Sequence, residues 1–268
     1  MTSPRPGRRM SGVLSAALVA VFAVASLPAP VSASTASDAE SLVVDLVNAQ
    51  RGARGLVPLR RYGDLADVAG RRAAKMRDTN VLSHSIAGDL GRQLTYEGVK
   101  WYRYGETIAY SRRAWAKEAA RDLVRMWMDS KPHRDLLLSN RLNYIGVGLA
   151  YRSSNGRTYG AVVMTESPDR NGARAWFTGA KLFAGNDITW SWAGDDLRLQ
   201  THTAGLRDFD VQYRVGSGSW RTIRNDTTSA SITLWNRGRG TTYGLRVRAT
   251  DNRGNIGKWS KEVRVTVP

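Results

Sequence analysis

The sequence predicts an α+β domain followed by an all-β sandwich. Between residues 37 and 129, apolar residues recur at spacings of three and four, which is typical of helices packed on a core. From residue 145 to 163 they alternate on both sides of the turn-forming pair Asn155-Gly156, as in an antiparallel hairpin. Beyond residue 167 no helical period remains, and short alternating segments are separated by Gly, Asn and Asp.

Three helices are expected in the first domain. The first begins at Ser37, which opens a capping-box pattern, and ends near Gly52. The second begins near Asp64, and the third covers residues 114–129 and is broken by Pro132. One side of the second helix carries Leu65, Val68, Ala69, Arg72 and Met76. Helices followed by strands indicate helices packed on a mostly antiparallel sheet.

Beyond residue 183 all periodic segments of the chain have the alternating apolar pattern of β-strands. These segments are 188–192, 209–215, 232–234, 243–249 and 263–267. Such closely spaced segments predict a β-sandwich over residues 183–268. Residues 167–182, of which 167–180 have turn composition, are expected to link it to the first domain.

The N-terminus has the pattern of a secretory signal peptide at residues 1–33. Arg5, Arg8 and Arg9 precede an apolar run at 12–27, and small residues follow at 31–33. A membrane anchor is the alternative, but the run is shorter than the roughly 20 residues that a spanning helix needs. We therefore expect export with cleavage and no transmembrane segment afterwards, with a twin-arginine signal as an alternative export route.

Composition excludes several classes of site. The 268 residues include no cysteine, so a disulfide scaffold, a thiol nucleophile and a thiolate zinc site are excluded. An exported chain without cysteine also suggests a bacterial surface. The net charge of +17 falls to +14 without the signal peptide and divides evenly, +7 before and +7 after residue 170. No basic stripe with interleaved aromatic residues occurs, so we expect no nucleic-acid partner, but rather an anionic cell-wall polymer or lipid head groups.

Few residues in the first domain could carry chemistry. His84, His133 and Glu106 could hold zinc with an open position for water, or act in acid–base catalysis. Their spacing fits no compact metal motif, and histidines satisfied by local hydrogen bonds are the alternative. The remaining histidine, His202, is expected at a surface or strand edge of the sandwich.

A series of motifs carries a resemblance to a known family. They are Leu46-Val47-Asn48-Ala49-Gln50-Arg51, Ser83-His84-Ser85, Gly105-Glu106-Thr107-Ile108-Ala109, Pro132-His133-Arg134 after Trp127-Met128, and Ile145-Gly146-Val147-Gly148. In this order, over about residues 38–166, the chain resembles the bacterial branch of the CAP superfamily, named for cysteine-rich secretory proteins, antigen 5 and pathogenesis-related 1, and also called SCP-like. The CAP-like domain is assigned to residues 34–166.

This resemblance implies an α-β-α sandwich with a cleft lined by two histidines and two acidic residues. His84 and His133 take the histidine places and Glu106 takes one acidic place. Ser130 stands at the second acidic place, and Asp129, one position earlier, points about 100° away on a helix. The resemblance thus implies an incomplete set, although His84, Glu106, His133 and water remain a four-coordinate zinc arrangement. Thr107 stands where the family often has Asn, and the position of Glu166 relative to the cleft is open.

The tail resembles an immunoglobulin-like sandwich of the fibronectin type III kind. The resemblance rests on an early Trp190 or Trp192, on the run 210–214 and on the run 243–251. For the tryptophans of the tail, core packing is the first interpretation and a carbohydrate-stacking platform is the alternative.

Together these features predict a secreted, extracellular CAP/SCP-like protein of a bacterial surface or medium. We expect a ligand- or metal-binding domain without enzymatic activity, joined to an adhesive or spacer sandwich. Two alternatives remain: a metal-dependent hydrolase acting on peptides or wall material through His84, His133 and Glu106, and a sterol- or lipid-binding protein. Zinc is the expected metal, and no other cofactor is expected.

Overall fold

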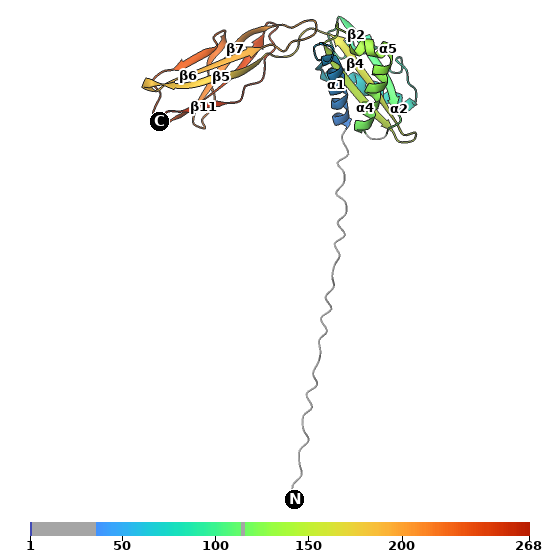
Figure 1. The fold of residues 1–268 in the computed structure, drawn as a ribbon, viewed down its shortest axis with the longest axis horizontal. Helices are drawn as coiled ribbons and strands as arrows, with labels where there is room; N and C mark the ends of the chain where they lie inside the picture. Colours follow the sequence, from blue (N-terminus) through green and yellow to red (C-terminus); the bar gives the residue numbers. More distant parts are fainter. Residues whose placement is uncertain (2–35, 114–115) are drawn as a thin grey trace. The chain divides into compact units, whose positions relative to one another are not determined.

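A computed structural model describes Met1, residues 36–113 and residues 116–268 (Figure 1). Apart from Met1, the expected signal peptide at residues 1–33 lies outside the described residues. Among the helices that are described, none has the length and apolar character needed to cross a membrane.

The first domain is a three-layer α-β-α arrangement. Its sheet has the order β1-β3-β4-β2, with β1 parallel to β3 and the other pairs antiparallel. The strands are β1 Arg60–Arg61, β2 Arg103–Ser111, β3 Tyr144–Arg152 and β4 Arg157–Glu166. The helices are α1 Ala36–Gly52, α2 Gly63–Thr79, α3 Leu90–Tyr96, α4 Ala116–Asp129 and α5 Lys131–Leu137. The expected α+β class is confirmed.

Both faces of this sheet are buried. Along β4, Val162 and Met164 pack with α1 and α4, whereas Ala161 and Val163 pack with α2. Successive strand residues point to opposite faces, so a strand covered on both sides is apolar at nearly every position. The two helical layers therefore create two cores, one on each side of β3 and β4.

Two glycines of β3 allow α2 to lie directly on the sheet. A Cβ on Gly146 would lie 2.1 Å from the backbone carbon of Leu65, and one on Gly148 would lie 2.2 Å from the backbone nitrogen of Gly70. A side chain at either position would push the helix away. The Ile145-Gly146-Val147-Gly148 motif is thus a packing requirement.

The helices predicted near Ser37 and Asp64 are confirmed, as is the third, whose described part begins at Ala116. Two short helices, α3 and α5, were not predicted. Pro132 does end α4, but it also opens α5 in the first turn, where its missing N–H costs nothing.

The second domain is a sandwich of two sheets. One has the order β11-β10-β7-β8 and the other β5-β6-β9. The strands are β5 Arg174–Phe183, β6 Asp187–Asp195, β7 Leu206–Val215, β8 Arg221–Thr227, β9 Ser231–Leu234, β10 Thr242–Asp251 and β11 Val263–Thr266. Trp190, Trp192, Val211 and Leu245 lie in its core, which confirms core packing for these two tryptophans. For Trp176 and Trp235 core packing is wrong, because both are exposed.

The expected linker at 167–182 is too long. Residues 174–183 form β5, which pairs with β6, so the connection covers only 167–173. β5 is an edge strand whose register shifts between Phe177 and Gly179, and much of it is exposed. None of its residues is buried and a bulge shifts its register, so it lacks a clear alternation of core and surface residues, which explains why its sequence resembles a loop.

Arginine and tryptophan side chains form a ladder on the sheet that contains β7 and β10. The guanidinium carbons of Arg214 and Arg246 lie 4.6 and 4.3 Å from the ring centre of Trp220. Those of Arg246 and Arg248 each lie 4.6 Å from that of Trp259. Arg214 also donates to Glu262, and Arg248 to Asp210. We refer to these five Arg and Trp residues as the Arg–Trp ladder.

Candidate functional site

Glu106 is the centre of a buried polar network in the first domain. It lies on β2, and its side chain is 4% exposed. Arg72, on α2, donates from Nε to Oε1 and from Nη2 to Oε2 of Glu106, the latter at 3.2 Å. Both carboxylate oxygens are therefore bound by one guanidinium in the bidentate geometry that arginine favours.

Arg72 also holds the loop that precedes α3. Its Nη2 donates to the carbonyl oxygen of His84, and its Nη1 donates to the carbonyl of Gly88 at 3.1 Å and to Oε1 of Gln93 at 3.2 Å. The sequence places Arg72 on the apolar side of its helix but assigns it no role. An arginine on an otherwise apolar helix face was the signal that could have indicated a buried ion pair.

His84 completes this network at the surface. Its Nδ1 lies 2.7 Å from Oε2 of Glu106, while 59% of its side chain is exposed. His133 lies on α5, where burial lowers its pKa and a charge on His84 lowers it further. His84 therefore contacts Glu106 directly, and His133 lies near enough for a charge on His84 to lower the pKa of His133.

This donor set fits a zinc site with three protein ligands poorly. His84, Glu106 and His133 are not a set whose ligand atoms all lie within 4.8 Å, although such a set exists elsewhere among the described residues. Both oxygens of Glu106 are already occupied by Arg72 and His84. At the second acidic place, Ser130 lies before α5, and Asp129 is exposed. Zinc binding therefore stays a prediction.

Other candidate residues lie apart from this network. Glu166 pairs with Arg103, and its Oε1 lies 3.0 Å from Nε2 of His202. Thr107 is fully buried, and its hydroxyl has no hydrogen-bond partner among the described residues. The hydroxyl of Ser83 lies 3.0 Å from that of Ser85.

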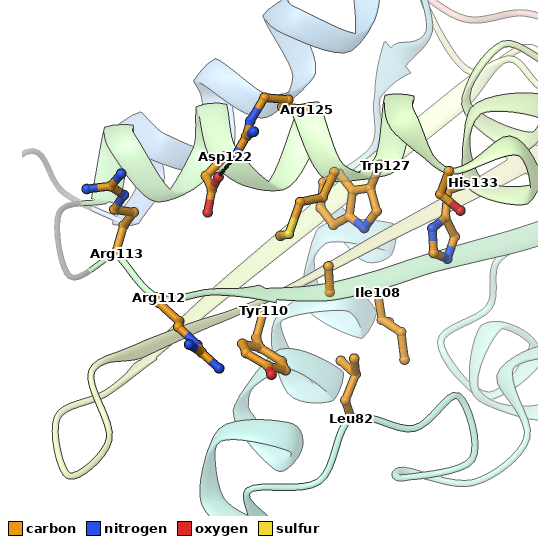
Figure 2. A pocket seen from close by; sticks show the side chains of 12 residues that line it. Leu82, Ile108, Tyr110, Arg112, Arg113, Asp122, Arg125, Trp127 and His133 are labelled. Carbon is orange, nitrogen blue, oxygen red and sulfur yellow. Dashed lines mark hydrogen bonds and ion pairs between the residues drawn. The ribbon is translucent and has the colours of Figure 1, made fainter.

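A groove of about 700 Å³ lies next to His133 (Figure 2). Side chains from β2, from α4 and from the loop after α2 line its middle. These apolar residues are Leu82, Ile108, Ala109, Tyr110, Met126 and Trp127. A second pocket of about 550 Å³ is lined by His84 and Glu106. His84 and His133 therefore line two different pockets.

The two ends of the groove differ in charge. Arg112, Arg113 and Arg125 lie at one end, and His133 lies at the other (Figure 2). Asp122 offsets part of this charge, because it pairs with Arg125 at 2.5 Å. Hydrogen bonds from Ser111 and Arg125 lower the pKa of the Asp122 carboxyl, which keeps it ionised.

One lining residue has an unused donor. The side chain of Trp127 is fully buried, and its Nε1–H has no hydrogen-bond acceptor within the part of the chain that the structure describes. Buried indole N–H groups usually find a partner.

Comparison with known proteins agrees with this architecture. Residues 44–165 match the sequence model of the cysteine-rich secretory protein family, CAP. Over 117 residues, the chain is 31% identical to "Uncharacterized protein YkwD" of Bacillus subtilis, a match that covers 43% of this chain and 44% of that protein. The chain thus matches less than half the length of this curated relative.

Solved structures resemble each domain. An extracellular protein containing an SCP domain from Bacillus anthracis is 26% identical, with a TM-score of 0.42, over 49% of this chain and 41% of that chain. A fibronectin-III-like (Fn3-like) protein from Clostridium thermocellum is 22% identical, with a TM-score of 0.28, over 37% of this chain and 96% of that chain.

Proposed function

Residues 44–165 belong to the CAP family, and from this premise we propose that the chain is an exported binding protein without enzymatic activity. Its ligand is an amphipathic anion, such as a fatty acid or an acidic phospholipid, held in the groove beside His133. The sandwich serves as an adhesive or spacer module at an anionic bacterial surface.

The charge pattern of the groove carries this proposal. Its middle is apolar, and its charged end offers Arg112, Arg113 and Arg125 against the single acid Asp122. An acyl chain buried along Ile108 and the neighbouring apolar side chains gains hydrophobic free energy, and the arginines attract an anionic head group. The volume of about 700 Å³ lies in the usual range for a site that holds a small organic ligand.

The network around Glu106 favours binding over hydrolysis. A general base must reach its proton through a free carboxylate oxygen, but Arg72 and His84 already contact both oxygens of Glu106. Ser83 has Ser85 as its hydroxyl partner, and neither hydroxyl is hydrogen-bonded to a histidine ring. These contacts describe a structural anchor for the loop that carries His84.

Calorimetric titration of palmitate into residues 34–268 tests the proposal. We expect saturable binding with one ligand per chain. A variant with Arg112→Glu and Arg113→Glu should bind at least about tenfold more weakly, which corresponds to about 1.4 kcal/mol. Arg92→Glu, an equally basic residue on α3 that does not line the groove, is the matched control and should bind as the wild type does.

Other outcomes would favour the alternatives. A neutral sterol that binds equally well to the wild type and to the double variant would indicate sterol binding without head-group recognition. Palmitate binding that the double variant retains in full would place the ligand outside this groove. Hydrolysis of peptides or wall fragments by the purified chain would contradict the non-enzymatic assignment.

A further inference from the structure

Three aspartates gather where the connection between the domains meets the sandwich. Asp169 lies in the connection at 167–173, Asp196 follows β6, and Asp251 ends β10. Each offers a carboxylate oxygen, and the three oxygens lie within 4.8 Å of one another. Asp169 is 3% exposed and Asp251 is fully buried, so this is not a solvated acidic surface.

No basic side chain in the described part of the chain forms an ion pair with Asp169, Asp196 or Asp251. The charge of Asp251 contributes to raising the pKa of Arg207, but the guanidinium of Arg207 forms its ion pair with Asp208, at 2.7 Å. Three carboxylates so close together in a buried place repel one another strongly, because little water screens them.

Neutral donors orient these carboxylates without neutralising them. Asp169 accepts from the backbone nitrogens of Asn171 and Ala204, each at 3.0 Å, and from the Tyr144 hydroxyl at 3.4 Å. Asp251 accepts from the backbone nitrogens of Arg253 and Asn255 and from the Asn255 side chain. Asp196 accepts from the backbone nitrogen of Gly205 at 2.6 Å.

A second observation is independent of the clustering. Oδ1 of Asp196 is buried, and no donor among the described residues meets hydrogen-bond geometry with it. A buried oxygen without a donor is costly, and more so on a carboxylate, so this atom needs a partner that the protein itself does not supply.

We infer that Asp169, Asp196 and Asp251 bind a calcium ion. The ligand set is made only of oxygen, which suits a hard cation and not zinc. The +2 charge of the ion would neutralise most of the charge of the three carboxylates. The ion would also supply the partner that Oδ1 of Asp196 lacks. Calcium tolerates irregular coordination completed by water, whereas magnesium demands a nearly ideal octahedron.

Calorimetric titration of CaCl₂ into chelator-treated residues 34–268 tests this site. We expect one ion per chain, with a dissociation constant on the order of 0.1–1 mM, as in extracellular calcium modules. Asp196→Asn keeps the shape of the side chain and should weaken binding at least about tenfold, because it removes one of three charges. Asp195→Asn is the matched control, since the neighbouring Asp195 is paired with Arg174 outside the cluster.

Melting temperature gives a second readout. Calcium at about ten times its dissociation constant should raise the melting temperature of the wild type and of Asp195→Asn by a few degrees, but not that of Asp196→Asn. The inference is overturned if the wild type binds no calcium at about 10 mM, or if Asp196→Asn binds it as tightly as the wild type. A response to magnesium as strong as that to calcium would overturn the assignment of the ion.

Discussion

Arg72 and Glu106 form an ion pair that is almost entirely buried, with side chains 1% and 4% exposed. The pair joins α2 to β2, and through Arg72 it reaches the backbone of His84 and Gly88. Two charges taken out of water must be compensated almost completely by each other and by nearby acceptors. The position of the loop that carries His84 therefore depends on this pair.

Replacing Glu106 by Gln should destabilise the first domain by about 3–5 kcal/mol, because the Arg72 guanidinium is left buried without a counter-charge. Urea unfolding followed by the circular dichroism of helices reports on this domain, since the described α-helices lie between Ala36 and Leu137. Glu97→Gln is the control. Glu97 pairs with Arg71, whose side chain is 52% exposed, and the expected loss is at most about 1 kcal/mol. Equal losses in the two variants would contradict a structural role for the buried pair.

Replacing Thr107 by Val should stabilise the same domain by about 1 kcal/mol. The Thr107 hydroxyl is buried without a partner, and valine has nearly the same shape without the polar group. Thr165→Val is the matched control, because Thr165 is equally buried on β4 but its hydroxyl lies 2.8 Å from that of Ser167. Unfolding free energies should change in opposite directions, and a loss of stability in Thr107→Val would show that its hydroxyl has a partner.

Replacing Gly146 by Ala should cost on the order of 3 kcal/mol, because the added Cβ would overlap the backbone of α2 at Leu65. Gly70→Ala tests the same helix from the other side. A Cβ at Gly70 would meet no atom within 4 Å, and alanine favours a helix interior by about 0.5–1 kcal/mol over glycine. Thermal melting should therefore fall in the first variant and rise in the second.

The sandwich should lose stability in acid through Glu262. Its hydrogen bond with Arg214 lowers its pKa, as does Arg264, so the pKa of Glu262 in the folded state lies below the ordinary value of a glutamate. The resulting stabilisation is fully present above the unfolded pKa and is lost as the pH falls through the folded pKa. Calorimetric melting of the wild type and Glu262→Gln should differ most near neutral pH and converge below about pH 4. A difference that stays constant with pH would exclude this ion pair as the cause.

For zinc, we expect equal and weak binding by the wild type and by a variant with His84→Ala and His133→Ala. Arg72 and His84 already contact Glu106, and His84 and His133 line different pockets, so the wild type lacks the three converging protein ligands of a typical catalytic site and loses little when both imidazoles are removed. Metal analysis after dialysis and calorimetry at neutral pH measure this. Stoichiometric zinc in the wild type that disappears in the double variant would restore the three-ligand interpretation.

The sequence predicts the layers of the fold better than its edges. Central strands such as β3 and β4 are easy to recognise in the sequence, because both of their faces are buried and they are therefore rich in apolar residues. β2 and β8 end their sheets, and many of their side chains face solvent, so their pattern is weak. The edge strand β5 was missed for the same reason.

For the site, the resemblance to the CAP family indicates His84, Glu106 and His133, but it does not indicate the partner of Glu106. Arg72 is 34 residues away in sequence, and only the packing of α2 on the sheet brings it to the carboxylate. The groove is equally invisible in the sequence, because the loop after α2 contributes Leu82 and β2 contributes Ile108. Contacts between distant segments depend on tertiary geometry, which local patterns do not encode.

The Arg–Trp ladder changes how the charge of the sandwich is counted. Arg214, Arg246 and Arg248 lie against tryptophan rings, and their N–H groups donate to Glu262, Gln212 and Asp210. Guanidinium groups held in this way already have partners for their donors and their faces. Glu262 and Asp210 are already counted in the formal +7 after residue 170, so the ladder and these two acids contribute only +1 to it, and basic residues outside the ladder carry most of the charge that an anionic polymer meets.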